Sequence, residues 1–441
     1  MTAGDPRLSG SGETDVGSVF ISNYPPYSAW SPAEVPHARR ILSRPPEAET
    51  PLGLYLHIPF CRKRCKFCYF KVYTEMDSAQ VRAYLSALSR EVRMLSNCPV
   101  VAGRPLSFVY FGGGTPSFVS VRDMRRLEAE LKAAIPWTGA REVTFECEPG
   151  TLTRPKVEAI RAMGVTRLSL GVENFSDSIL RENGRAHVSA EIDRVLPWIR
   201  AQAFDQLNID LIAGMVGETW ESWRQTVRRT IDAGADSVTI YQMELPYNTV
   251  YSKDLLAGDG GPRVAGWDLK RAWHDHAIEA LESAGYEISS AYTMIRKGSG
   301  ARFVYRDSVW HGCDLLGAGV ASFSHVGGIH YQNESEWGPY ISRLESGEIP
   351  IARALATTSG QRAVREMILQ LKLGRLEAAP FARKFGRDVL AEHAGTFRRL
   401  EAEGMLVVRP GGVELTRKGL LRVDHLLPAF YAGEYHGARY T

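Results

Sequence analysis

Cysteine is scarce in this sequence, with six residues among 441, so a framework of disulfide bonds is excluded. Long hydrophobic runs are also absent, because no apolar stretch approaches the roughly 20 residues that span a bilayer. The opening segment MTAGDPRLSGSGETD has no basic region followed by an apolar stretch, so we expect no secretory signal. These absences predict a cytoplasmic protein with no membrane partner.

Charge of one sign is not in excess either, since 53 Lys and Arg residues face 50 Asp and Glu residues and the net charge is +3. This balance gives no compositional case for a nucleic-acid-binding protein. A hydrophobic fraction of 44% and a charged fraction of 23% are ordinary for globular proteins, which excludes a disordered or collagen-like chain. The length allows two or three domains.

The sequence divides into four segments of different texture. The first is an arm without helical or strand period that carries eight of the 23 prolines and can pack through Tyr24, Tyr27 and Trp30. The second alternates apolar runs with amphipathic stretches, the third is rich in glycine and aromatic residues and suits a substrate wall, and the fourth is mainly helical. The predicted boundaries are 1–51, 52–290, 291–357 and 358–441.

The second segment predicts parallel βαβ units, because apolar runs alternate with longer amphipathic stretches. The predicted strands are 52–58, 106–111, 142–146, 167–172, 206–212 and 237–243. The predicted helices are 78–95, 121–134, 154–163, 189–202, 219–233 and 267–284. Six such units fit an open, partial α/β barrel better than a closed barrel of eight units.

The fourth segment predicts a winged-helix-like domain. Helical stretches precede the turn-and-strand pattern GMLVVRPGGVELT, at 358–373, 378–384 and 387–403. Such domains often bind DNA, but Glu366, Glu377 and Glu401 interrupt any basic face. We therefore expect a lid or packing module and no nucleic-acid partner.

Three of the cysteines, Cys61, Cys65 and Cys68, lie within eight residues directly after the first predicted strand. The carboxyl ends of barrel strands carry the chemistry in such folds. Three thiolates suit an iron–sulfur cluster that keeps one iron open. A structural zinc ion would need a fourth ligand, for which only His57 is near, and a disulfide bond would leave one thiol over. The cysteines by themselves leave these three interpretations open.

Further polar residues end or interrupt the other predicted strands. The turn 112–115 (GGGT) allows a backbone to approach a ligand closely and offers N–H groups to a carboxylate or phosphate. Glu146, Glu173 and Asp210 stand in apolar strands, where a carboxylate is costly unless it is paired or hydrogen-bonded. Arg185 could bind a ligand carboxylate with its planar fork, although a salt bridge explains it equally well.

As a set, these motifs resemble the radical S-adenosylmethionine (SAM) superfamily and, within it, the HemN-like family of oxygen-independent coproporphyrinogen III dehydrogenases. The matching stretches are 55–61 (YLHIPFC), 111–116 (FGGGTP), 168–172 (LSLGV) and 208–212 (NIDLI). The resemblance covers about 52–425. It implies a partial (β/α)6 radical SAM barrel with a C-terminal winged-helix-like domain of the HemN type.

The resemblance also implies the cofactors and their ligands. The three clustered cysteines would hold a [4Fe–4S] cluster, which cleaves SAM to methionine and a 5′-deoxyadenosyl radical. The residues that would contact one or two SAM molecules are Tyr55, Gly113, Gly114, Thr115, Glu146, Glu173, Arg185 and Asp210.

Two positions depart from the dehydrogenase pattern, since Phe70 replaces a cysteine and Glu173 replaces a glutamine. Phe70 is instead similar to haem-trafficking relatives and to class C radical SAM methylases. We therefore expect a class C enzyme with two SAM molecules, a C-methyltransferase or cyclopropanase that transfers a SAM-derived methylene to an sp2 carbon of a natural-product intermediate. The candidate catalytic residues are Glu173, His325 and His330, although hydrogen-bonded core positions explain both histidines.

The expected partners are an unsaturated small molecule, an electron donor such as flavodoxin or ferredoxin, and a methyltransferase-like protein. Two alternative functions remain. One is an oxygen-independent coproporphyrinogen III oxidase that acts on propionate side chains and needs a basic cavity, with Arg296, Lys297, Arg302 and Arg306 as candidates. The other is a haem-trafficking protein with His311 or His325 as axial ligand.

Overall fold

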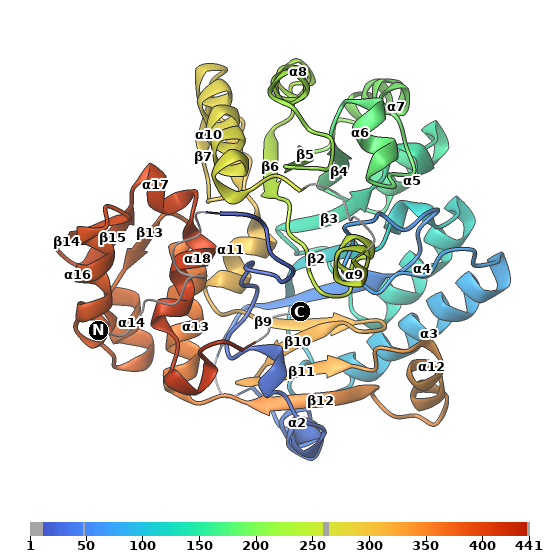
Figure 1. Ribbon diagram of the computed structural model, residues 1–441. Coiled ribbons are helices and arrows are strands. Elements are labelled where there is room, and N and C mark those ends of the chain that lie inside the picture. Colours follow the sequence, from blue (N-terminus) through green and yellow to red (C-terminus); the bar gives the residue numbers. More distant parts are fainter. Residues whose placement is uncertain (1–11, 47–48, 259–263, 439–441) are drawn as a thin grey trace.

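The computed structural model describes residues 12–46, 49–258 and 264–438. Its centre is a curved sheet of parallel strands surrounded by helices (Figure 1). Strands β1 to β6 follow one another in the sheet in chain order and pair in parallel. They are Leu52–Ile58, Leu106–Gly113, Glu142–Cys147, Arg167–Glu173, Gln206–Ala213 and Ser237–Gln242. The predicted partial barrel with six βα units is thereby confirmed.

The outer helices follow the strands in alternation, as the amphipathic pattern predicts. The main ones are α3 (Ser78–Ser96), α4 (Val121–Ala134), α5 (Arg154–Ala162), α7 (Ser189–Ala201), α8 (Trp220–Asp232) and α10 (Trp267–Ser283), with the short α6 (Asp177–Glu182) between β4 and α7. Helix α3 begins where Asp77 accepts the N–H groups of Ala79 and Gln80 and the Gln80 side chain accepts the N–H of Asp77. This reciprocal cap satisfies backbone donors that the first helical turn leaves free.

Six additional strands extend the sheet at both edges, so the whole sheet has twelve strands rather than the six expected. Strand β9 (Asp314–Ala318) pairs in parallel with β1, and the antiparallel strands β10 (Phe323–Val326), β11 (Ile329–Asn333) and β12 (Ile351–Ala356) continue from it. On the other side, β8 (Thr293–Arg296) covers the edge of β6, and β7 (Tyr286–Ile288) follows. These additions pair the edge groups that an open barrel would leave free.

The C-terminal part folds around a hydrophobic cluster of its own. Its helices are α13 (Ser359–Leu371), α14 (Ala379–Phe385), α15 (Val389–Glu392), α16 (Ala394–Ala402), α17 (Arg417–Leu420) and α18 (Val423–Leu426). Its small sheet has the order β13 (Arg375–Glu377), β15 (Gly412–Leu415), β14 (Leu406–Arg409). Helices followed by this hairpin form the predicted winged-helix-like domain, which lies beside the barrel (Figure 1).

The N-terminal arm runs between the barrel and the C-terminal domain before it reaches α2 (Val35–Leu42) (Figure 1). The N–H of Gly17 donates to the carbonyl of Leu245 at 2.8 Å, and the N–H of Ile21 donates to Asp424 at 3.0 Å. The Tyr27 ring stacks on Phe323, with the ring centroids 4.2 Å apart. The arm therefore connects the two domains.

The remaining helices fill the gaps between these parts. Helix α9 (Val250–Ala257) lies in front of the barrel in Figure 1, α11 (Val304–Trp310) packs against β2, and α12 (Trp337–Glu345) packs against α3. Short 3-10 turns are η1 (Tyr27–Ala29), η2 (Pro32–Glu34), η3 (Pro116–Phe118), η4 (Pro149–Thr151), η5 (Leu427–Phe430) and η6 (Gly433–Tyr435). None of the helices in the described ranges has the length and apolarity that crossing a membrane requires.

Candidate active site

The loop after β1 carries the three clustered cysteines, none of which forms a disulfide bond. The Cys61 thiol lies 3.4 Å from the hydroxyl of Thr115, and the N–H of Cys68 donates to the carbonyl of Cys65 at 3.1 Å. Burial raises the pKa of Cys61 to about 11 and the pKa of Cys68 to about 12. Both thiols therefore stay protonated at neutral pH until a metal displaces the proton.

Arg185 connects this loop to the barrel strands. Its Nη1 donates to the sulfur of Cys65 at 3.3 Å, and its Nη2 donates to the carbonyl of Gly171 at 2.8 Å. The same Nη2 lies 3.5 Å from the carboxylate of Glu173. The buried Nε of Arg185 has no partner in the described part of the chain. The guanidinium is thus placed between the thiols and an acidic group and keeps a donor free.

Three carboxyl groups face one another across β3, β4 and β5. Glu146 accepts the Tyr110 hydroxyl at 2.7 Å and the N–H of Gly113 at 3.1 Å. Asp210 accepts the Ser169 hydroxyl at 2.8 Å, whereas the Glu173 carboxylate has Arg185 as its ion-pair partner. The structure therefore brings together the three acids that the sequence singled out, and Arg185 is beside them.

Burial shifts the titration of these carboxyl groups. It raises the pKa of Glu146 and the pKa of Glu173 to about 7, and it raises the pKa of Asp210. Arg185 opposes the rise at Glu173, while the charges of Asp210 and Glu146 add to it. Perturbed groups that gather in one place are typical of functional sites.

The backbone of Glu173 is strained, because its φ is 61°, in the left-handed region that residues other than glycine seldom adopt. The residue falls where the pairing between β4 and β5 shifts register. Such strain persists when the surrounding structure holds it, and it is concentrated at functional sites.

The raised pKa of Glu173 predicts how stability depends on pH. The pKa of Glu173 in the folded protein, about 7, lies above the ordinary 4.5. The contribution of its protonated carboxyl group to the free energy of unfolding is therefore fully present below pH 4.5 and is lost as pH rises to 7. Glu173→Gln should therefore gain stability relative to wild type over this interval, by on the order of 1–3 kcal/mol. Thermal unfolding of the apoprotein at several pH values measures the difference, and a difference that stays constant with pH would contradict the prediction.

The glycine turn after β2 has a local structural reason. A Cβ at Gly113, whose φ is 111°, would lie 2.5 Å from Nδ1 of His57. A Cβ at Gly114 would lie 2.8 Å from the backbone of Pro59. The N–H of Gly113 donates to Glu146, and that of Gly114 donates to the carbonyl of Ile58 at 2.9 Å. These N–H groups are already paired, so the expectation that they are offered to a ligand anion is wrong.

Alanine at Gly114 is expected to lower stability, because its Cβ meets rigid backbone rather than a side chain that could move. We expect a loss of about 1–3 kcal/mol, as for other overpacked positions. Gly139→Ala is the control, since a Cβ there meets nothing within 4 Å, and a change within about 0.5 kcal/mol is expected. Equal unfolding temperatures for the two variants would contradict this role of Gly114.

Tyrosines line the space beside the acids. Tyr55 stacks on Tyr110 with ring centroids 5.8 Å apart, and Tyr110 contacts Tyr305 with centroids 4.5 Å apart. Tyr241 is 40% exposed, and burial and the charges of Asp210 and Glu146 raise its pKa well above its usual range, so its side chain lies near the acids. Sequence reasoning missed Tyr110, Tyr241 and Tyr305. The alternation within the predicted strands could have found the first two.

The structure places His325 and His330 away from the acids, on β10 and β11. Their Nδ1 atoms are 3.0 Å apart, Trp30 stacks on His330 with ring centroids 5.2 Å apart, and Nε2 of His330 is 3.2 Å from the carbonyl of Tyr24. Burial lowers the pKa of both histidines well below the usual range. Hydrogen bonds and stacking within the core account for both side chains.

The predicted basic cavity does not form from the residues named for it. Arg296 is exposed and pairs with Asp236, whereas Arg306 is buried and pairs with Asp307 at 2.7 Å. Lys297 and Arg302 are also exposed. Local sequence proximity did not place these four side chains around a common space.

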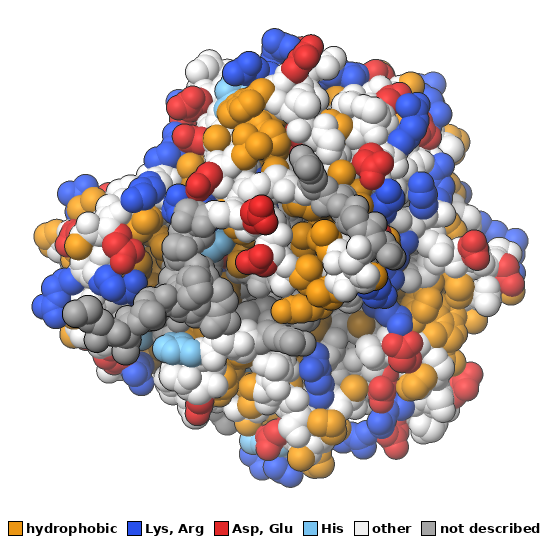
Figure 2. Space-filling view, in the orientation of Figure 1, with side chains coloured by type: hydrophobic (Ala, Val, Ile, Leu, Met, Phe, Trp, Pro, Cys, Tyr) orange, Lys and Arg blue, Asp and Glu red, His pale blue; other side chains and the backbone are white. Residues whose placement is uncertain are grey.

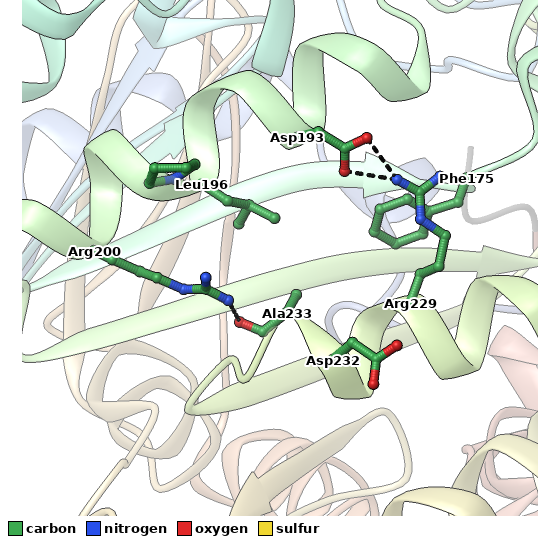
Figure 3. A pocket seen from close by; sticks show the side chains of 8 residues that line it. Phe175, Asp193, Leu196, Arg200, Arg229, Asp232 and Ala233 are labelled. Carbon is green, nitrogen blue, oxygen red and sulfur yellow. Dashed lines mark hydrogen bonds and ion pairs between the residues drawn. The ribbon is translucent and has the colours of Figure 1, made fainter.

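A hollow of about 250 Å³ lies between α7 and α8 in the outer helical layer (Figure 3). Arg229 pairs there with both carboxylate oxygens of Asp193, at 2.6 and 2.8 Å, and Arg200 donates to the carbonyl of Ala233 at 2.6 Å. Since these charged groups have partners, the hollow contributes nothing to the chemistry of the barrel.

The residues of the barrel site fit an iron–sulfur cluster and SAM. The donor set is three thiols on one loop, and Arg185 supplies a positive charge beside Cys65. Within the described ranges, no three His, Cys, Asp or Glu side chains converge on one ion, which disfavours zinc. A cluster binds each thiolate through a different iron, so its ligands need not converge on a point.

Comparison with known proteins identifies the class. Residues 55–230 match the radical SAM superfamily, and residues 358–422 match the HemN C-terminal domain. The fold matches the solved coproporphyrinogen III oxidase (HemN) from Escherichia coli with a TM-score of 0.81 and 25% identity, over 95% of this chain and 99% of that chain. The chain thus has the radical SAM fold with a C-terminal HemN domain, and this class implies a [4Fe–4S] cluster and SAM.

Relatives at the sequence level narrow the class. An oxygen-independent coproporphyrinogen III oxidase of Escherichia coli (strain K12) is 27% identical, over 87% of this chain and 86% of its own. A heme chaperone, HemW, of Bacillus subtilis (strain 168) is 25% identical, over 85% of this chain and 98% of its own. The chain therefore combines a radical SAM domain with a HemN C-terminal domain, and its fold is similar to that of a HemN enzyme.

The expectation of a class C methylase or cyclopropanase is wrong. The relatives and the matching structure carry the names of the two alternatives, coproporphyrinogen oxidase and heme chaperone. The expectation depended on Phe70, a single position after the last cysteine. One substitution carries less weight than a fold and two domain matches that cover most of the chain.

Proposed function

We propose that the protein is an oxygen-independent oxidase of a coproporphyrinogen-type tetrapyrrole, which acts on propionate side chains. The observation that carries the proposal is the fold match to coproporphyrinogen III oxidase over 95% of this chain. The position of Arg185, which contacts the Cys65 thiol, the Gly171 carbonyl and the Glu173 carboxylate, supports an intact site. This contact set joins the cysteine loop to the barrel acids, as an intact catalytic site requires. A protein whose cluster had lost its catalytic role would not need this link between the cysteine loop and the barrel acids.

The bound cluster and SAM would supply the abstraction of one hydrogen atom from a propionate, which becomes a vinyl group by losing CO2 and one further electron to an acceptor. Cys61, Cys65 and Cys68 would hold the cluster. Arg185 would bind the SAM carboxylate, and Glu146, Glu173 and Asp210 would accept hydrogen bonds from its amino and hydroxyl groups, with Tyr55 and the turn 113–115 beside them. The three carboxyl groups can accept more hydrogen bonds than the amino group of one SAM molecule donates. A second SAM molecule is therefore part of the proposal.

The physiological setting belongs to the same proposal. A donor such as flavodoxin or ferredoxin would reduce the cluster in the cytoplasm. The methyltransferase-like partner has no role in this reaction.

Equilibrium dialysis with labelled SAM would measure how many SAM molecules one protein chain binds.

The test is anaerobic incubation of reconstituted protein with reductant, SAM and coproporphyrinogen III labelled in its propionate carboxyl carbons. We expect labelled CO2 and 5′-deoxyadenosine in proportion to each other. SAM cleavage that is indifferent to the tetrapyrrole, with no labelled CO2, would overturn the proposal.

A second candidate is a heme chaperone, which Phe70 favours because that residue is similar to those of haem-trafficking relatives. In the structure, Phe70 is 43% exposed and stacks on Tyr69 with ring centroids 4.5 Å apart, beside Cys68. Capture of haem without turnover of coproporphyrinogen, seen as a stable absorbance band, would select this candidate.

A further inference from the structure

Arg365, on α13 of the C-terminal domain, is a buried cation that has no ion-pair partner among the described residues. It is 3% exposed, and its Nε donates to Oδ1 of Asn23 at 2.6 Å. Its Nη1 is buried without a hydrogen-bond partner, and it forms no ion pair within the described residues. An isolated buried charge is costly unless an anion or several hydrogen bonds compensate it.

The groups around Arg365 do not supply that anion. The adjacent carboxylate of Glu366 acts on Arg365 through its charge, but its ion pair at 2.6 Å is with Lys384. Cys313 is a neutral thiol, since burial raises its pKa to about 12. His325 and His330, whose pKa values burial and Arg365 lower, stay neutral and add no charge. The cation is therefore left for a ligand to neutralise.

Arg365 lies near enough to two aromatic side chains of the barrel side to act on them through its charge. Its charge opposes the rise that burial causes in the pKa of Tyr27 and of Tyr305. Tyr305 contacts Tyr110, whose hydroxyl donates to Glu146. Tyr27, Tyr305 and Phe323 all keep part of their surface accessible. A succession of side chains, Tyr305 and then Tyr110, therefore leads from the guanidinium to Glu146.

Residues of three separate parts of the chain surround Arg365. Asn23 of the arm fixes its Nε and lies 3.5 Å from Nδ1 of His330 on β11. The rings of Tyr27 from the arm and Phe323 from β10 stack on each other nearby. Because the arm, the sheet extension and the C-terminal domain all contribute, the position exists only in the fully assembled fold.

We propose that Arg365 binds a carboxylate of the substrate and thereby orients it in the barrel. The inference rests on the proposed function, in which the substrate carries four carboxylates. It also gives the C-terminal domain a direct part in substrate recognition. A guanidinium suits this task because its planar fork matches a carboxylate.

The experiment measures binding of coproporphyrin III and of its tetramethyl ester by fluorescence, with the full-length reconstituted protein. Wild type should bind the tetra-acid more tightly than the ester. Arg365→Met should weaken binding of the acid by roughly 10- to 100-fold, the range for loss of a charged hydrogen bond, and leave binding of the ester nearly unchanged.

Arg362→Met is the matched control, because it removes the same charge from the same helix but its Nη1 donates to the carbonyl of Thr357 at 3.0 Å. We expect its affinity for the acid within about twofold of wild type. The cluster absorbance of each variant reports whether it has folded. Equal affinity of wild type for acid and ester overturns the inference without recourse to any variant.

Two further outcomes separate the inference from its premise. If wild type and Arg365→Met bind the tetra-acid equally, the role of Arg365 is overturned and the proposed function is unaffected. If wild type binds neither compound, the proposed function fails and this inference fails with it.

Discussion

Replacing Cys61, Cys65 and Cys68 together by alanine is expected to abolish the cluster absorbance and with it the cleavage of SAM. The three thiols share one loop after β1, and no other described cysteine lies on that loop. Without thiolates no iron–sulfur cluster can be held. Ultraviolet–visible spectra, iron content and 5′-deoxyadenosine formation after anaerobic reconstitution measure the result.

The chain offers a matched control in its other three cysteines. Changing Cys98, Cys147 and Cys313 to alanine removes the same number of thiols, and two of these are buried as small apolar residues. This variant should keep full iron content and absorbance. Cleavage of SAM that survived the first triple change would refute the cluster assignment altogether.

Replacing Arg185 by methionine is expected to weaken SAM binding by roughly 30- to 100-fold while the cluster remains. The estimate corresponds to the loss of a charged hydrogen bond to a ligand carboxylate. The substitution also leaves Glu173 without its ion-pair partner, so the pKa of Glu173 should rise further, since Arg185 now lowers it. Equilibrium dialysis with labelled SAM measures the affinity.

Arg181→Met is the control for this change, because Arg181 is exposed on α6 and pairs with Asp177 at 3.3 Å. Removing such a surface ion pair costs little, so its SAM affinity should match wild type. Unchanged affinity in Arg185→Met, with the cluster intact, would show that Arg185 positions the cysteine loop rather than the ligand.

Much of the barrel could be predicted from the sequence, because hydrophobic periodicity is a local property. The helix predicted at 121–134 is Val121–Ala134 in the structure, and the strand predicted at 52–58 is Leu52–Ile58. Strands β7 and β10 are short, and Glu287 in β7 and Ser324 and His325 in β10 interrupt their apolar residues, so their apolar signal was weak. The pairs that attach these strands to the barrel, β8 with β6 and β9 with β1, join segments far apart in the chain, which periodicity does not report.

The residues of the candidate site also differ in whether the sequence alone could reveal them. Glu146, Glu173 and Asp210 could be found because a carboxylate within an apolar strand is conspicuous in a sequence. Arg365 could not be found in this way, since nothing local marks an arginine in an amphipathic helix as buried without a partner. The predicted basic residues 296–306 were chosen by proximity in sequence, and the structure sends them to different surroundings.

The contacts of the N-terminal arm set an order on biosynthesis. Ile21 hydrogen-bonds to Asp424, 403 positions later, and Tyr24 packs against Tyr431. Ile21 and Tyr24 can therefore dock only after Asp424 and Tyr431 have been synthesised, because domains fold progressively from the N-terminal side during synthesis. Until then the barrel lacks the arm, which lies between it and the C-terminal domain in the complete fold (Figure 1). Apolar side chains gather near the centre of the face shown in Figure 2, and Leu256 of α9 is 66% exposed even in the complete fold. Docking of the arm, which joins the barrel to the C-terminal domain, is accordingly a late step of folding.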